Sequence, residues 1–221
     1  MKQRGASPAE RRPIAVLVAD DHPVVRKGIR QILDDTPDIV VAGEATNARE
    51  VLAHVREEVC DVVLLDLTMP GSTGLDLLEA VRRERPELPV LVLSMHPEDQ
   101  YAVRVLKAGA AGYMTKESAP DELVQAIRKV YAGGKYVTPS VAERLVDELG
   151  GGGRAPHEAL SDREFEVLCL IAKAMSVKQI ARELQLSEKT VSTYRARVLE
   201  KLRLGSTAAL IRYAIRNRLV D

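Results

Sequence analysis

The first 132 or so residues alternate short runs of branched apolar residues with longer segments in which apolar residues recur at helical spacing. The helical spacing is clear over residues 24–33, 75–81 and 123–130. Strands joined by helical crossovers pair in parallel and carry helices on both faces, so the pattern predicts an α/β fold with a doubly wound, five-stranded parallel sheet. The predicted strands are IAVLVA from Ile14, DIVVAGEA from Asp38, DVVLLD from Asp61, PVLVLS from Pro89 and AAGYMTK from Ala110.

From Gly133 this alternation stops. GGKYVTPS is followed by a short amphipathic piece, VAERLVDEL, and then by four consecutive glycines at positions 150–153. A run of glycines loses too much backbone entropy to lie within a helix or strand, so we interpret it as a flexible hinge at a domain boundary. A phosphate-binding glycine loop is the alternative, but such loops follow a strand, and this run follows a predicted helix.

The segments after the hinge all have helical character. Ser161, with Glu164 three residues later, predicts a capping box, and Ser187 is a predicted N-cap. Two short helices joined by a tight turn, the second of them basic, resemble a helix-turn-helix. The sequence therefore predicts a small all-α domain of four helices, LSDREFEVLCLIAKA, VKQIAREL, SEKTVSTYRARVLEKL and TAALIRYAIRNRL.

These patterns divide the chain into four parts. Residues 1–13 are expected to be a flexible tail, because MKQRGASPAERRP has no apolar segment of the kind that a signal peptide requires. Residues 14–134 are expected to form the α/β domain. Residues 135–157 are expected to be a linker with one short helix and the glycine-rich hinge, and residues 158–221 the helical domain.

Composition narrows the class of protein. Apolar residues make up 46% and charged residues 29% of the 221 residues, which is typical of a globular protein, and no apolar run is long enough to span a membrane. We therefore expect a cytoplasmic protein with no membrane partner. Cys60 and Cys169 lie far apart beside apolar runs, which predicts two buried free thiols and neither a disulfide nor a metal site.

Charge is distributed unevenly along the chain. The net charge is zero, yet residues 157–221 contain 12 Lys and Arg against 8 Asp and Glu, whereas the preceding residues contain 20 against 24. A basic C-terminal part raises the expectation of an anionic partner there, although a surplus of this size is weak support when taken alone.

Acidic side chains gather at the ends of two predicted strands. Asp66 directly follows four branched apolar residues, and Asp20 and Asp21 end the first strand. In a doubly wound sheet of order 2-1-3-4-5, strands one and three are neighbours, so these carboxylates converge on one crevice. Three carboxylates in one pocket repel, and hard oxygen ligands suit Mg²⁺. Lys116 and Ser94 end two further strands at the same edge. Each of these residues alone is ordinary in a loop, but together they predict a site.

At these residues a resemblance to a known family becomes clear. The motifs ADDHP, LLDLTMPGSTG, VLSMH and AGAAGYMTK resemble the flavodoxin-like receiver domain of two-component response regulators, from Ile14 to about Ala132. The resemblance implies that Asp66 accepts a phosphoryl group from a sensor histidine kinase. It also implies that Mg²⁺ is held by Asp21, Asp66 and the backbone carbonyl of Thr68 with help from Asp20 through water, that Ser94 and Lys116 bind the phosphoryl oxygens, and that Tyr113 changes rotamer with Ser94.

The helical domain resembles the LuxR-type helix-turn-helix, and the two domains together resemble the NarL/FixJ family of transcription regulators. Departures from the family pattern occur at Ala174-Met175, where Ala-Gly is common, and at Tyr194, where His is frequent. The resemblance implies double-stranded DNA with paired half-sites as a partner and a homodimer when the protein is phosphorylated. The fourth predicted helix is either core only or, as the family suggests, a dimerisation surface with Leu210, Ala214 and Ile215.

Winding the third helix of this domain at about 100° per residue separates two faces. One face is apolar and is expected to pack in the core through Val191, Tyr194, Val198 and Leu202. The opposite face is either simply solvated or, as the second helix of a helix-turn-helix, enters the major groove through Lys189, Ser192, Thr193, Ala196 and Arg197. Phosphate contacts, which add affinity but little sequence information, are predicted for Lys178, Arg195 and Lys201.

Two other classes of protein are compatible with parts of this pattern. Phosphatases of the haloacid dehalogenase type also place a nucleophilic Asp after an apolar strand, but they need a second Asp two residues later, where this chain has Thr68. A constitutive DNA-binding protein with a degenerate receiver domain would lack some of the acidic and basic site residues, and all of them are present. The sequence therefore favours a regulator and not an enzyme.

Overall fold

The computed structural model describes residues 12–69, 74–95, 98–150, 156–184, 186–217 and 219–220. Most of the predicted N-terminal tail and residues 151–153 of the glycine run lie outside the described residues. The chain divides into two compact units, and the main division falls between Thr138 and Pro139. None of the helices in the part of the chain that the structure describes has the length and apolar character needed to cross a lipid bilayer.

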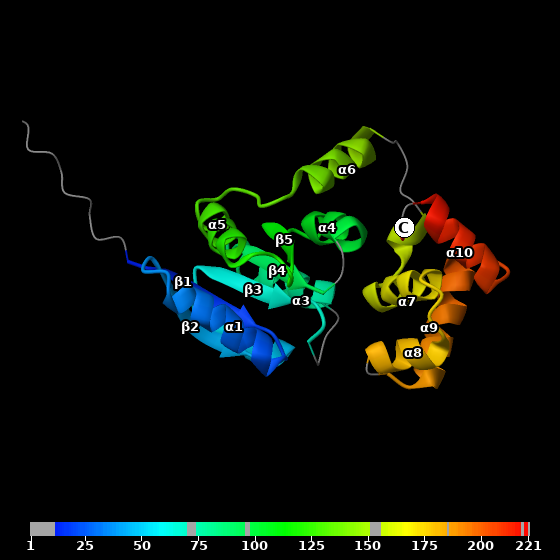
Figure 1. Cartoon of the computed structure of the whole chain (residues 1–221), viewed down its shortest axis with the longest axis horizontal. Helices are drawn as coiled ribbons and strands as arrows, with labels where there is room; N and C mark the ends of the chain where they lie inside the picture. Colours follow the sequence, from blue (N-terminus) through cyan, green and yellow to red (C-terminus); the bar gives the residue numbers. More distant parts are fainter. Residues whose placement is uncertain are drawn as a thin grey trace, which may run out of the picture. The chain divides into compact units, whose positions relative to one another are not determined.

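The first unit is a five-stranded parallel sheet covered by helices on both faces (Figure 1). The strand order β2-β1-β3-β4-β5 confirms the predicted doubly wound fold. The strands are β1 (Ile14–Ala19), β2 (Ile39–Ala45), β3 (Val62–Asp66), β4 (Val90–Ser94) and β5 (Gly112–Thr115). The helices are α1 (Pro23–Asp34), α2 (Ala48–Arg56), α3 (Gly74–Glu84), α4 (Glu98–Lys107) and α5 (Pro120–Tyr131).

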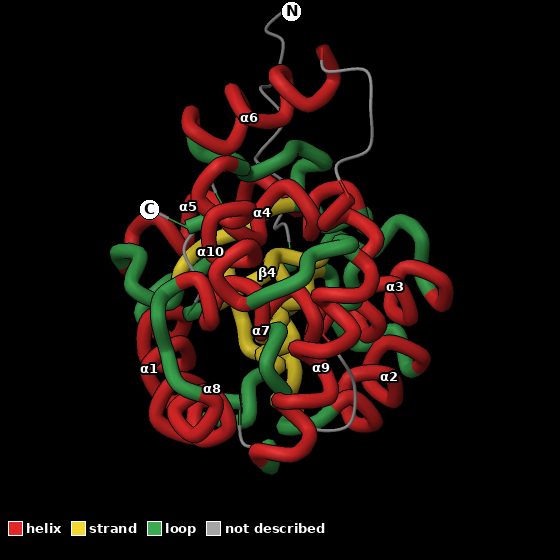
Figure 2. The backbone as a smooth tube through the Cα atoms, turned by 90° about the vertical axis from the view of Figure 1, so that its right-hand side faces the viewer, coloured by secondary structure: helices red, strands yellow, loops and turns green. Residues whose placement is uncertain are grey.

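The core of this unit explains why apolar runs become central strands. Every residue of β3 and β4 is buried, as expected for strands that are covered on both faces. Figure 2 shows α1 on one side of the sheet and α2 and α3 on the other. The apolar faces of α1 and α5 meet the sheet on the same side, where Leu33 and Ile127 are fully buried beside Val16 and Leu64.

The free edge of β5 is covered by the chain that follows α5. Tyr136 donates its backbone N–H to the Ala111 carbonyl oxygen at 2.9 Å, and its own carbonyl oxygen accepts from the backbone N–H of Tyr113 at 3.4 Å. A Cβ atom at Gly112 would lie 2.7 Å from the Tyr136 carbonyl oxygen, so this close approach requires glycine. Residues 135–136, which the sequence assigned to the linker, therefore lie against the sheet.

The second unit is helical. It contains α6 (Pro139–Gly150), the short helix predicted within the linker, and a 3₁₀ turn at Pro156–Ala159. The prediction that the glycine run lies outside any helix is wrong for Gly150, which is the last residue of α6. The four helices predicted after the hinge are present as α7 (Asp162–Ala172), α8 (Val177–Glu183), α9 (Glu188–Lys201) and α10 (Thr207–Arg216). Helix α7 packs against α8, α9 and α10, and α8 packs against α9, which confirms a compact all-α domain (Figure 1).

Side-chain caps define the starts of these helices. The Ser161 hydroxyl accepts from the Glu164 backbone N–H at 3.4 Å, and the Glu164 carboxylate accepts from the Ser161 backbone N–H at 2.7 Å, so the predicted capping box is confirmed. Ser176 and Gln179 form a second capping box at α8. The Ser187 hydroxyl accepts from the Thr190 backbone N–H at 3.0 Å, which confirms the predicted N-cap of α9.

Both cysteines are free and buried, as predicted. Burial raises the pKa of the Cys60 thiol to about 11. This thiol therefore stays protonated at neutral pH, because the neutral form is favoured in an apolar environment.

The end of α7 holds Ala174 in a conformation that favours glycine. Ala174 has a φ of 61°, in the left-handed region, and its N–H donates to the Ile171 carbonyl oxygen at 2.9 Å. The Met175 N–H donates to the Leu170 carbonyl oxygen at 3.2 Å, so the chain leaves the helix through a left-handed C-cap. Glycine adopts this conformation without a steric cost, whereas the Cβ atom of an alanine clashes with the backbone, so the backbone at Ala174 is strained.

We expect Ala174→Gly to stabilise the protein by about 0.5–1 kcal/mol. The left-handed conformation costs a non-glycine residue about 1–2 kcal/mol, and the greater entropy of glycine in the unfolded chain offsets part of that gain. Chemical denaturation measured by circular dichroism checks the change. Ala172→Gly is the matched control, because the same substitution inside the last turn of α7 should destabilise by about 1 kcal/mol at most. Destabilisation by both substitutions would contradict the assignment of strain to Ala174.

Candidate functional site

An acidic pocket forms where β1 and β3 end side by side. Asp20 directly follows β1, and Asp66 is the last residue of β3, which pairs with β1 in parallel. Both carboxylates are buried, with exposed fractions of 2% and 1%. Asp21 and His22 complete the group, and the ligand atoms of all four residues lie within 4.8 Å of one another. The predicted convergence of the three carboxylates is therefore observed.

Local hydrogen bonds hold the loop that carries Asp20. The Asp20 Oδ1 atom accepts the His22 backbone N–H at 2.8 Å, and the Asp20 backbone N–H donates to the Ala45 carbonyl oxygen at 3.0 Å. Arg26 Nη1 donates to the Asp20 carbonyl oxygen at 2.8 Å, and Arg26 Nε donates to Glu44 at 3.2 Å. Helix α1 and strand β2 thus position the first carboxylate from both sides.

Lys116 is the cation at the centre of the pocket. Its Nζ atom lies 2.6 Å from Asp20 Oδ2 and 2.8 Å from Asp66 Oδ2. The Lys116 backbone N–H donates to the Ser94 carbonyl oxygen at 2.8 Å, which ties the residue after β5 to the end of β4. Burial lowers the pKa of Lys116, but Asp66 and Asp20 outweigh burial and raise the pKa above its usual value. The ammonium is therefore charged at neutral pH.

Thr68 binds the carboxylate of Asp66 through two groups. Its backbone N–H donates to Asp66 Oδ1 at 3.1 Å, and its hydroxyl donates to Asp66 Oδ2 at 2.8 Å. A dehalogenase-type phosphatase needs a second Asp at this position. In this protein the position is occupied by Thr68, which holds the Asp66 carboxylate in place. Ser94 is buried at the end of β4, and Tyr113 in β5 is 2% exposed, so its ring packs inward in this state.

The pocket carries more negative than positive charge. Asp20, Asp21 and Asp66 contribute three carboxylates, against the one ammonium of Lys116. His22 Nδ1 lies 2.7 Å from Asp21 Oδ1 and 3.2 Å from Asp20 Oδ1. Asp20 Oδ2 lies against the Lys116 ammonium and Asp21 Oδ1 against the His22 imidazole, but neither of these buried oxygens accepts a well-aligned hydrogen bond from a described residue. Buried oxygens of this kind are ready ligands for a hard divalent cation.

Sequence reasoning did not single out His22 and Arg26. His22 stands beside the aspartate pair in ADDHP and was the easier of the two to recognise. Arg26 acts through a backbone carbonyl and through Glu44, which is 18 positions away in the sequence, so no local spacing reveals it.

In the second unit, the burial of α9 divides its residues into the two expected faces. Val191, Val198 and Leu202 are buried, and Tyr194 is half-buried. The residues predicted to face DNA are all exposed, namely Lys189, Ser192, Thr193, Ala196 and Arg197. The helix thus presents a polar face of short and basic side chains that the domain's own core does not use.

The three predicted phosphate contacts differ in their surroundings. Lys178 is exposed near the start of α8, and Arg195 is half-exposed on α9. The Nζ atom of Lys201, by contrast, lies 2.6 Å from Glu164 Oε2, and the Glu164 side chain is only 4% exposed. The ammonium of Lys201 is therefore already paired within the domain.

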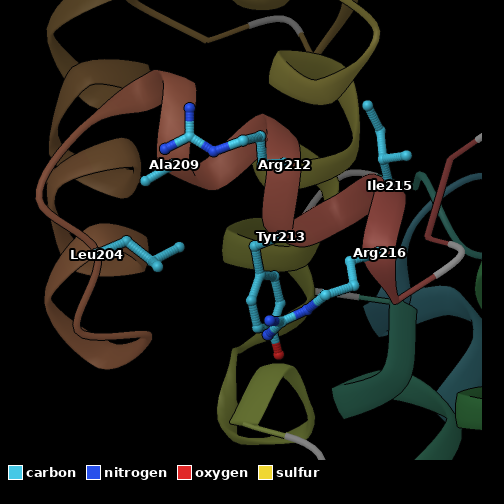
Figure 3. A pocket seen from close by; sticks show the side chains of 6 residues that line it. All are labelled: Leu204, Ala209, Arg212, Tyr213, Ile215 and Arg216. Carbon is cyan, nitrogen blue, oxygen red and sulfur yellow. The ribbon is translucent and has the colours of Figure 1, made fainter.

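Helix α10 has one buried and one open side. Leu210 and Ala214 are buried in the domain core, whereas Ile215 is 55% exposed. A pocket of about 560 Å³ lies on this helix, and Figure 3 shows Leu204 approaching it from the segment after α9. The lining residues are Leu204, Ala209, Arg212, Tyr213, Ile215 and Arg216.

Known proteins share both halves of this arrangement. Residues 16–128 match the response regulator receiver domain, and residues 158–214 match the bacterial regulatory proteins of the luxR family. The chain is 41% identical over 210 residues to the response regulator GacA of Pseudomonas aeruginosa, and the match covers 94% of this chain and 98% of GacA.

Two solved structures of RcsB are similar over most of their length. RcsB from Salmonella enterica serovar Typhimurium bound to the promoter rprA with phosphomimetic BeF₃⁻ has a TM-score of 0.59 and 29% identity, covering 91% of this chain and 98% of RcsB. A structure of two RcsB dimers bound to two parallel DNAs has a TM-score of 0.57 and 30% identity, covering 95% of this chain and 100% of RcsB. Both family models match, and the match to GacA covers nearly the whole of each chain. This chain therefore belongs to the NarL/FixJ family of two-component response regulators.

Proposed function

We propose that this protein is a transcription regulator whose binding to DNA is switched by phosphorylation of Asp66. The observation that carries the proposal is the buried Asp66 carboxylate, held by Thr68 and Lys116 at the end of β3 beside two further carboxylates. A carboxylate positioned in this way can act as a nucleophile toward phosphorus. The partner implied is a sensor histidine kinase that carries a phosphohistidine.

The transfer step uses side chains at or just after the carboxyl ends of β3, β4 and β5. An Asp66 oxygen attacks phosphorus and the O–P bond forms. The N–P bond to the donor imidazole, which is protonated on its other ring nitrogen, breaks, and neutral imidazole leaves with that electron pair. Lys116 compensates charge on the transferring group, and the hydroxyl of Ser94 is proposed to bind a phosphoryl oxygen. Catalysis of this kind depends mainly on position and on electrostatic compensation.

The residues in the pocket also fit Mg²⁺. We propose that Asp21, Asp66 and the Thr68 carbonyl oxygen hold the ion, with Asp20 contributing through water, because the pocket has an excess of carboxylates and buried oxygens without aligned donors. When bound, the ion supplies positive charge that offsets the negative charge of the phosphoryl group.

Phosphorylation is proposed to change the packing of β4 and β5. An acyl phosphate brings up to about two negative charges and three acceptor oxygens, which the Ser94 hydroxyl can follow. Tyr113 lies on the neighbouring strand, and its inward position in this state leaves an outward rotamer as the alternative. Two such arrangements are the basis of a switch.

We expect Asp66→Asn to abolish phosphorylation by acetyl phosphate and Mg²⁺, and Asp21→Asn to reduce it strongly, while both proteins stay folded. The first change removes the nucleophile and the second removes a proposed metal ligand. Intact-protein mass spectrometry measures the acyl phosphate. Asp61→Asn is the matched control. Asp61 lies just before β3, at the opposite end of the strand from Asp66, so this substitution should leave phosphorylation unchanged. A stable acyl phosphate on another residue of the wild-type protein would contradict the assignment.

The exposed face of α9 is proposed to read the major groove. The short side chains of Ser192, Thr193 and Ala196 allow a close approach to base edges, and Lys189 and Arg197 flank them. Lys178 and Arg195 are proposed to contact phosphates. The solved complex of the similar protein RcsB with promoter DNA supports a DNA-binding role for this domain.

The double variant Ser192→Thr, Thr193→Ser should prefer a different DNA sequence from the wild-type protein, because both side chains are proposed to face the bases. Lys178→Ala should instead weaken all sequences similarly and reduce the slope of log affinity against log salt by about 1, since one phosphate contact is lost. Selection from a random DNA library and salt titrations measure the two effects. A changed preference in Lys178→Ala with none in the Ser192 and Thr193 variants would reverse the assigned faces.

Dimerisation is the proposed link between phosphorylation and DNA. The structure of RcsB dimers on DNA supports a dimer in this family, and the half-exposed Ile215 with Leu204 offers one surface for it on α10. A dimer raises the effective concentration of the second DNA-binding domain near a paired site. Reversing a 1:99 population of two states needs roughly 5.5 kcal/mol of differential stabilisation, which two half-sites supply more readily than one.

Beryllofluoride with Mg²⁺ should therefore strengthen binding of the full-length protein to a paired site by about tenfold or more beyond its effect on a single half-site. Fluorescence anisotropy on both DNAs, with and without the phosphoryl analogue, measures this difference. Asp66→Asn is the control and should show no response to the analogue. Equal affinities in all four wild-type titrations would mean that this receiver domain does not control DNA binding.

A further inference from the structure

An ion pair in the helix-turn-helix domain joins the start of α7 to the end of α9. Glu164 Oε2 accepts the backbone N–H of Ser161 at 2.7 Å and lies 2.6 Å from Lys201 Nζ. The same ammonium lies 3.5 Å from the carbonyl oxygen of Ala159. One carboxylate oxygen thus caps α7 and ties the last turn of α9, so two helices depend on a single side chain.

The environment of this pair differs from that of a surface ion pair. The Glu164 side chain is 4% exposed and the Lys201 side chain 42%, so the carboxylate depends on its partners inside the domain while the lysine stem covers it from outside. Burial raises the pKa of Glu164, but the hydrogen bonds from Lys201 and Ser161 outweigh burial and hold it below its usual value. Glu164 is therefore ionised at neutral pH.

Helical geometry places Lys201 at the edge of the face proposed to read DNA, one turn beyond Arg197. At about 100° per residue, Lys201 lies about 180° around the helix from Ser192 but only about 40° from Arg197, and at about 1.5 Å per residue it lies about 13 Å along the axis from Ser192. Val191 and Val198 are buried and fix the rotation of α9 about its axis. The pair at Lys201 fixes the far end of the same helix, and with it the angle at which the reading face is presented.

We propose that Glu164 positions the recognition helix through Lys201, and that Lys201 acts within the domain and makes no contact with the DNA backbone. The inference rests on the proposed role of α9 in DNA binding. It replaces the sequence-based expectation that Lys201 is a phosphate contact. A lysine held by a buried carboxylate is a poor phosphate ligand, because binding phosphate would leave Glu164 without its cation.

The test uses the full-length protein and fluorescence anisotropy on specific and random DNA over a series of salt concentrations. Lys201→Gln should weaken specific binding by roughly tenfold, about 1.4 kcal/mol, with an unchanged salt slope. Lys178→Gln, a proposed phosphate contact, should instead lower the slope by about 0.9. Glu164→Gln should weaken specific binding as Lys201→Gln does, and the double variant should be no weaker than either single variant.

Two controls separate positioning from charge and from stability. Glu200→Gln removes a negative charge, as Glu164→Gln does, but from an exposed neighbour of Lys201, and it should leave specific binding unchanged. Lys201→Arg keeps the positive charge and should bind specific DNA as the wild-type protein does. All titrations are made well below the unfolding transition of each variant, which circular dichroism locates.

The possible results are distinct. A salt slope that falls by about 0.9 in Lys201→Gln would overturn the inference, because it would identify a phosphate contact. Lower thermal stability of both pair variants with unchanged affinity and selectivity would also overturn it, since the pair would then be structural only. If the wild-type protein showed no salt-dependent DNA binding, the proposed function itself would fail and the inference with it.

Discussion

Repulsion among three carboxylates at the carboxyl edge of the sheet is the constraint on which the receiver domain depends. Two like charges about 4 Å apart repel by about 4 kcal/mol at an effective dielectric constant of 20. Lys116 offsets part of this by contacting Asp20 and Asp66 at 2.6 and 2.8 Å. The remaining negative charge gives the pocket its character, because it favours the binding of a divalent cation.

The fold keeps this pocket compact through close backbone approaches. A Cβ atom at Gly74 would lie 2.5 Å from the Leu67 carbonyl oxygen, so α3 can begin close to the loop after Asp66 only with glycine at that position. At the β5 edge of the sheet, Gly112 allows Tyr136 to pair with β5. The strand that carries Tyr113 is therefore held by β4 on one side and by the chain leading to the next domain on the other.

The sequence predicts the fold and the receiver pocket well for a physical reason. Parallel strands that are buried on both faces are continuous apolar runs, and their carboxyl ends meet at one edge, so Asp20, Asp66 and Lys116 could be brought together from strand order alone. Contacts between distant helices have no such periodic signal. The pairing of Lys201 with Glu164 joins residues 37 positions apart, and no local pattern indicates it, so the sequence predicted only a phosphate contact for Lys201.

Each domain contains a buried carboxylate paired with a lysine from a distant element, and the neighbours of each pair decide what it does. Asp66 shares Lys116 with a second buried carboxylate, so neither carboxylate is fully compensated and the pocket favours a further cation. Glu164 has Lys201 and the Ser161 amide on one oxygen and forms part of a capping box, so its charge is satisfied within the domain. The same two residue types therefore leave an excess of negative charge in one domain and form a balanced ion pair in the other. The difference lies in whether the surrounding charges balance.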